Sequence, residues 1–166
     1  GYVTATDRGC VAIYKSVPGD ATPKQLHRVG VSSSLRLTPD GKTLIVGESW
    51  GRRLTAFDIG ERGALSNPRV WADLGRNVPD GICLDADGAI WSADPRNNEV
   101  IRVAEGGEIL ERLSTGDEGA FACMLGGPRR RTLFVCVNGG AGPKVASSTD
   151  GRIVYQDVGV EGAGWP

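Results

Sequence analysis

Residues 78–91 read Val78-Pro79-Asp80-Gly81-Ile82-Cys83-Leu84-Asp85-Ala86-Asp87-Gly88-Ala89-Ile90-Trp91. Two short apolar runs, Ile82–Leu84 and Ala89–Trp91, flank the polar tetrapeptide Asp85–Gly88. Asp and Gly favour tight turns, because an Asp side chain can accept backbone N–H groups and Gly adopts positive φ without strain. The stretch therefore predicts a strand, a tight turn and a second strand.

The same pattern occurs twice more along the chain. A third strand and a fourth strand often follow each predicted hairpin. The repeat is about 40–45 residues long, which is typical of a propeller with four strands in each blade. The other hairpins are 35–46 and 121–135, and the strands that follow the hairpins are 53–58, 69–72, 99–103 and 108–112.

These repeats predict an all-β fold, a partial β-propeller of about four antiparallel blades with three or four strands each. Residues 1–166 are expected to form a single domain. Its blade units are about 1–29, 31–74, 78–113 and 117–158. A β-sandwich would not need a sequence repeat of this length. A βαβ fold would need helical segments between the strands, and no useful window has a helical period.

Composition and charge limit the partners. The chain has 166 residues and a net charge of -1, which gives no electrostatic reason to expect nucleic acid or an anionic membrane. No apolar stretch is long enough to span a membrane. The first nine residues lack the charged start and apolar run of a signal peptide.

Four cysteines stand at positions 10, 83, 123 and 136. Their spacing matches no metal motif. Cys83, Cys123 and Cys136 lie in apolar runs, so we expect buried free thiols, which pack as small hydrophobic groups. This favours a reducing compartment and predicts a cytoplasmic protein.

The chain resembles the senescence-marker-protein/gluconolactonase (luciferin-regenerating) family from its third blade to its end. The resemblance implies the later blades, three to six, of a six-bladed propeller, with the first blades preceding residue 1. The residues that carry it are Leu37–Ser49, Arg53–Ile59, Val78–Asp85, Asp87–Trp91, Phe121–Gly127 and Ala163–Pro166.

The resemblance also implies a function, the hydrolysis of lactones or related esters with a divalent metal in the central channel. The metal would be Ca²⁺, Mg²⁺, Mn²⁺ or Zn²⁺. Asp80, in Pro79-Asp80-Gly81, matches the family's metal-binding Asp and would also be the catalytic base. Ser33 stands where the family has a metal-binding Asn. The family's other two ligands would precede residue 1.

Alternative interpretations of these carboxylates stay open. Asp80 could be a turn residue, since Pro-Asp-Gly favours turns. Asp85 and Asp87 resemble part of a calcium loop, but a hairpin turn is favoured because the downstream Glu of an EF-hand is absent. Glu48 and Asp94 end corresponding second strands, and we interpret them as solvated turn residues rather than channel ligands.

Three functional hypotheses follow, because an open arc of blades exposes sheet edges and apolar faces. The chain could be a lactonase or esterase that a second copy or another chain completes. It could be a non-catalytic remnant that binds or assembles with a partner. It could also be a fragment of a longer hydrolase. The sequence leaves open whether this chain by itself is an enzyme.

Overall fold

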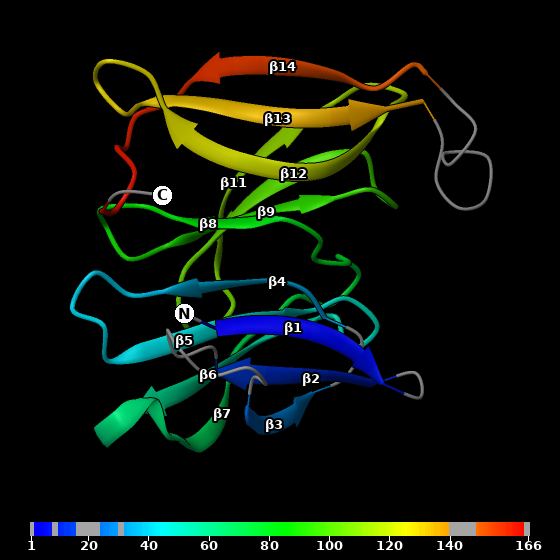
Figure 1. Cartoon of the computed structure of the whole chain (residues 1–166). Coiled ribbons are helices and arrows are strands. Elements are labelled where there is room, and N and C mark those ends of the chain that lie inside the picture. Colours follow the sequence, from blue (N-terminus) through cyan, green and yellow to red (C-terminus); the bar gives the residue numbers. More distant parts are fainter. Residues whose placement is uncertain (1, 8–9, 16–23, 30–31, 140–148, 165–166) are drawn as a thin grey trace.

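The computed structural model describes residues 2–7, 10–15, 24–29, 32–139 and 149–164, and it describes side chains from residue 34 onward. These residues form fourteen strands in four antiparallel sheets (Figure 1). The first sheet contains β1 (Tyr2–Asp7), β2 (Cys10–Lys15) and β3 (Lys24–Val29); the second β4 (Ser32–Leu37), β5 (Thr43–Glu48), β6 (Arg53–Ile59) and β7 (Leu65–Asp73); the third β8 (Ile82–Leu84), β9 (Ile90–Asp94), β10 (Glu99–Val103) and β11 (Ile109–Ser114); and the fourth β12 (Gly119–Gly126), β13 (Thr132–Asn138) and β14 (Arg152–Asp157).

Within each sheet the strands pair in chain order, so every sheet is a simple meander. A short 3-10 helix, η1 (Glu61–Gly63), joins β6 to β7. The second, third and fourth sheets follow one another in space as they do in sequence (Figure 1). The predicted all-β fold with blades of three or four antiparallel strands is confirmed.

The central strands of the second sheet, β5 and β6, are buried on both faces, and their apolar residues do not alternate with polar ones. On β5, Leu44 and Val46 pack with Phe57 on one face. Ile45 lies between them in sequence and points to the opposite face, where it packs with Leu54. Continuous apolar runs of this kind are what a strand needs when both its faces are covered.

Two apolar clusters join neighbouring sheets. The first fills the space between the second and third sheets and includes Trp71, Ile82 and Ile101. The second joins the third and fourth sheets around Trp91, which is 0% exposed. The hydrophobic cores therefore lie between blades, and each blade depends on its neighbour for burial of its faces.

The turn between β8 and β9 confirms the hairpin prediction for Asp85 and Asp87. Asp85 accepts hydrogen bonds from the backbone N–H groups of Asp87 and Ala89, both at 3.0 Å. Gly88 has a φ of 83°, which a side chain would disfavour. Arg102 donates to both carboxylates, at 2.8 Å each, so the two Asp residues have turn and ion-pair roles.

The outer face of the fourth sheet carries apolar side chains that no described residue covers. Ile153 is 67% exposed and Tyr155 is 74% exposed on β14. Phe134 on β13 lies beside Tyr155, with ring centroids 6.3 Å apart. Cys136 is also exposed, so its predicted burial is wrong, whereas Cys83 and Cys123 are buried as expected. Alternation along β13 puts Cys136 on this outer face.

A segment near the C-terminus, residues 158–164, runs from the fourth sheet to the third. Ala163 donates its N–H to the Leu84 carbonyl at 3.0 Å, and Ala86 donates to the Glu161 carbonyl at 2.8 Å. The Arg130 guanidinium donates to the carbonyls of Gly162 and Gly164. Arg130 thus holds this segment against the fourth sheet.

Within the part of the chain that the structure describes, no helix has the length and apolar character needed to cross a bilayer. The predicted cytoplasmic location and the predicted absence of nucleic-acid partners remain predictions.

Candidate functional site

The first strands of the second, third and fourth sheets are β4, β8 and β12, which we call the inner strands. All three begin with the same irregularity. In β4, Ser33 is the extra residue between the pairs Ser32–Glu48 and Ser34–Gly47. In β12, Phe121 is the extra residue between the pairs Ala120–Val137 and Ala122–Cys136. Such β-bulges re-aim side chains and are frequent beside active sites.

Asp80 occupies the corresponding place before β8. Its N–H donates to the Ala93 carbonyl at 2.9 Å, and Ala93 donates back to the Gly81 carbonyl at 2.9 Å. Asp80 and Gly81 therefore oppose a single residue of the partner strand, as in a bulge. Ser33, Asp80 and Phe121 therefore hold equivalent positions at the starting ends of the three inner strands.

Hydrogen bonds connect these positions across the sheets. The Ser34 hydroxyl donates to the Asp80 carbonyl at 2.6 Å, which joins β4 to the start of β8. The Gly81 N–H donates to the Phe121 carbonyl at 2.8 Å, which joins β8 to β12. The backbone that presents the half-buried Asp80 is thus fixed from both sides. The side chain of Ser33 lies outside the described residues, so its predicted role as a metal ligand remains a prediction.

Gly81 allows the close approach of β8 and β12. A Cβ atom added to Gly81 would lie 2.5 Å from Ala122 Cα and 3.0 Å from the Phe121 carbonyl oxygen. We expect Gly81→Ala to lower the free energy of unfolding by about 1–3 kcal/mol, because backbone atoms would have to shift. Chemical denaturation measures the change.

Gly159→Ala is the matched control, because nothing lies within 4 Å of a Cβ added there. It should change the free energy of unfolding by less than about 0.5 kcal/mol, as surface substitutions usually do. Equal effects of the two substitutions would show that the contact between Gly81 and Ala122 is not tight in solution.

Two other carboxylates lie at the ends of second strands, and both have structural partners. Glu48 is 3% exposed and accepts hydrogen bonds from Thr55 and Arg53. Asp94 is 1% exposed and accepts the backbone N–H groups of Arg96 and Asn97 at 2.9 and 3.1 Å. Asp94 is the turn residue that was predicted, but both carboxylates are buried, so describing them as solvated was wrong.

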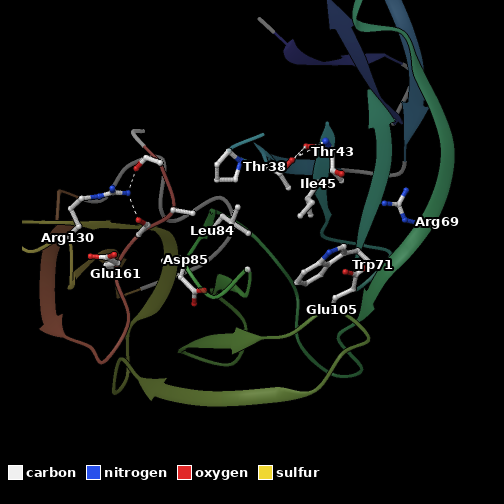
Figure 2. Close-up of a pocket in the computed structure, with 16 residues that line it drawn as sticks. Thr38, Thr43, Ile45, Arg69, Trp71, Leu84, Asp85, Glu105, Arg130 and Glu161 are labelled. Carbon is white, nitrogen blue, oxygen red and sulfur yellow. Dashed lines mark hydrogen bonds between the residues drawn. The ribbon is translucent and has the colours of Figure 1, made fainter. Parts of the chain in front are cut away.

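A cavity of about 510 Å³ lies beside the turn that follows β8, at the end of this inner strand that is opposite to Asp80. Figure 2 shows Trp71, Arg69 and Glu105 on one side of it and Arg130 and Glu161 on the other. Arg69 already pairs with Asp58 at 2.7 Å, and Arg130 holds the segment 158–164. We therefore place the candidate site at the end that carries Asp80.

Comparison with known proteins gives the family of the chain. A family described as the SMP-30/Gluconolactonase/LRE-like region matches residues 3–138. The chain belongs to this family. Regucalcin from Xenopus laevis is 28% identical over 133 residues, which make up 78% of this chain and 44% of that protein.

Solved structures of the SMP-30/gluconolactonase type share the fold. A calcium-binding protein, regucalcin, from Agrobacterium tumefaciens superposes with a TM-score of 0.75 at 20% identity, over 99% of this chain and 58% of that one. A gluconolactonase from Xanthomonas campestris superposes with a TM-score of 0.66 at 25% identity, over 81% of this chain and 44% of that one. The chain therefore spans about half the length of the relatives it matches.

The SMP-30/gluconolactonase resemblance implies a divalent metal. The oxygen donors present in this chain show whether its residues could hold such an ion. Asp80 and Ser33 bring one carboxylate and one hydroxyl, whereas Ca²⁺ takes roughly six to eight oxygen ligands. In residues 34–139 and 149–164, no three His, Cys, Asp or Glu residues gather as a metal site. These residues do not by themselves fit a complete metal centre, so we assign no catalytic step to a metal ion.

Proposed function

We propose that this chain supplies the Asp80 side of a site that hydrolyses lactones or related esters. The observation that carries the proposal is the bulge that presents Asp80 at the start of an inner strand. Hydrogen bonds from Ser34 and to Phe121 hold its backbone. The family membership and the gluconolactonase likeness support the same class of reaction.

The step that we assign to Asp80 is proton transfer. Its carboxylate would take the proton from a water molecule as the oxygen of that water attacks the ester carbonyl carbon, and it would return the proton to the alcohol oxygen of the ester as the bond between that oxygen and the carbonyl carbon breaks. Asp80 suits this role because the residue is half-buried, so water can reach it, and because hydrogen bonds fix the backbone that carries it. Asp80 is thus the catalytic residue of the proposal.

Further polypeptide is needed to complete the site. The remaining donors would come from a second copy of the chain, from another chain that closes the arc, or from further residues of a longer protein that contains this chain. The apolar outer face of the fourth sheet, with Phe134, Ile153 and Tyr155, is a surface that such a partner would cover. A divalent ion would then bind only in the assembled form.

The first test measures mass by light scattering, divalent metal on the same chromatographic peak, and turnover of an aldonic acid lactone. We expect an assembly larger than one chain that carries metal and hydrolyses the lactone. Asp80→Asn should abolish turnover without changing the mass. Asp40→Asn, an exposed turn residue, is the control and should leave turnover unchanged. A metal-free single chain without turnover would overturn the proposal.

A non-catalytic binding module is the second candidate. Phe121 favours it, because an aromatic ring and not a polar ligand occupies the third of the equivalent bulge positions. An assembly with neither metal nor lactone turnover would support this candidate. Metal together with turnover that depends on Asp80 would exclude it.

A further inference from the structure

Two buried thiols face each other across the boundary between the third and fourth sheets. Cys83 lies on β8 and Cys123 on β12, and their sulfur atoms are 3.9 Å apart. Cys83 is 2% exposed and Cys123 is 4% exposed. The two strands are also in close contact nearby, where Gly81 packs directly on Ala122. The pair therefore lies in a rigid part of the arc.

A small molecule can reach Cys83 from one side. Cys83 lines a cavity of about 300 Å³ between the inner strands β4, β8 and β12. Leu35, Leu84 and Leu125 give this cavity an apolar wall, and Arg36 adds a positive charge. Hydrogen peroxide is small and uncharged, so it fits a cavity of this size.

The two thiols differ in their surroundings. The Cys123 thiol lies within hydrogen-bonding distance of the Trp91 and Gly81 carbonyls, at 3.4 and 3.5 Å. The contact with Cys83 and the burial raise the pKa of Cys123 well above its ordinary value. The hydrogen bond from Cys123 lowers the pKa of the Cys83 thiol. Cys83 is thus the better nucleophile, since thiolates are the reactive form.

We propose that Cys83 and Cys123 form an oxidisable dithiol site, which hydrogen peroxide converts to a disulfide between β8 and β12. The Cys83 thiolate attacks one peroxide oxygen, the O–O bond breaks, and Cys83 becomes a sulfenic acid with release of hydroxide. The Cys123 sulfur then attacks the Cys83 sulfur and displaces the hydroxyl group. Together the two thiols lose two hydrogen atoms and the peroxide becomes two water molecules.

The geometry permits the second step. A disulfide has a sulfur–sulfur distance of about 2.05 Å, so the two sulfur atoms must approach each other by roughly 1.9 Å. Rotation of the side chains supplies a movement of this size without separating the strands. Exposed Cys136 has no sulfur partner among the described residues, so exposure alone would predict a different first site of oxidation.

Peptide mapping tests the proposal, because trypsin places each cysteine in a separate peptide. Cys83 falls in 77–96, Cys123 in 113–129, Cys136 in 132–144 and Cys10 in 9–15. After treatment of the 166-residue chain with hydrogen peroxide, we expect peptide 77–96 linked to peptide 113–129. Dithiothreitol should release the link. Separate peptides that carry sulfinic or sulfonic acid, or a link that includes 132–144, would overturn the proposal.

One variant and its control identify the sulfur atom that attacks the peroxide. In Cys123→Ala the Cys83 sulfenic acid has no partner, so dimedone should label peptide 77–96. Cys136→Ser is the matched control and should form the link between Cys83 and Cys123 as the parent chain does. If the buried substitution prevents folding, the map of the parent chain still decides the proposal. The outcome is independent of lactone turnover.

Discussion

Asp85→Ala is expected to lower the free energy of unfolding by about 3–5 kcal/mol, since it leaves two backbone N–H groups without their acceptor and removes the most buried partner of Arg102. The Asp85 side chain is 0% exposed and lies 2.8 Å from the Arg102 guanidinium. It also accepts the N–H groups of Asp87 and Ala89, which shape the turn. The substitution removes the ion pair and the turn contacts together. Urea denaturation followed by circular dichroism measures the loss.

Asp87→Ala is the control for this prediction, because Asp87 also contacts Arg102 at 2.8 Å but its side chain is 70% exposed. Exposed ion pairs contribute about 0–1 kcal/mol, so the loss should stay within that range. Similar losses for the two variants would contradict the view that burial makes Asp85 the dominant residue of the turn.

Trp91→Ala is expected to lower the free energy of unfolding by about 3–5 kcal/mol, because it empties a large volume in a closed core. Trp91 is 0% exposed and packs among residues of the third and fourth sheets, including Ala120 and Leu133. The Arg102 guanidinium lies 6.0 Å from its ring centroid. Thermal unfolding followed by far-ultraviolet circular dichroism measures the effect without relying on tryptophan fluorescence.

Trp50→Ala separates loss of a core residue from loss of any tryptophan. Trp50 is 67% exposed and contacts Arg96 across 5.3 Å. An exposed cation–π contact contributes about 0.5–1 kcal/mol, so this variant should remain close to the parent chain. If Trp91→Ala cost no more than Trp50→Ala, the interface between the two sheets would not be packed as described.

The strands were predictable because local sequence patterns, short apolar runs separated by turn residues, indicate them. The apolar runs of β5 and β9 and the Asp-Gly turn between β8 and β9 depend on neighbours in sequence, and they specify hairpins wherever they occur. Family resemblance then singled out Asp80, although composition and spacing alone favoured a turn there. Its position on a bulge agrees with both interpretations.

The non-local contacts could not be predicted. Family resemblance also marked Ser33, but a bulge leaves no clear sign in so short a strand, so nothing in the sequence marked Phe121 as equivalent to Asp80. The contact between Cys83 and Cys123 depends on how two sheets face each other. The partner of Arg130 lies more than thirty residues further along the chain. Only packing brings such residues together.

The segment 158–164 also imposes an order on biosynthesis. A ribosome makes β8 long before it makes Ala163, yet Leu84 at the end of β8 pairs with Ala163. The hairpins can form as they emerge, since their partners are adjacent, but the hydrogen bonds of Leu84 and Ala86 form only after this late segment has been made. Until then the Leu84 carbonyl and the N–H of Ala86, in the turn after β8, lack these partners in the nascent chain.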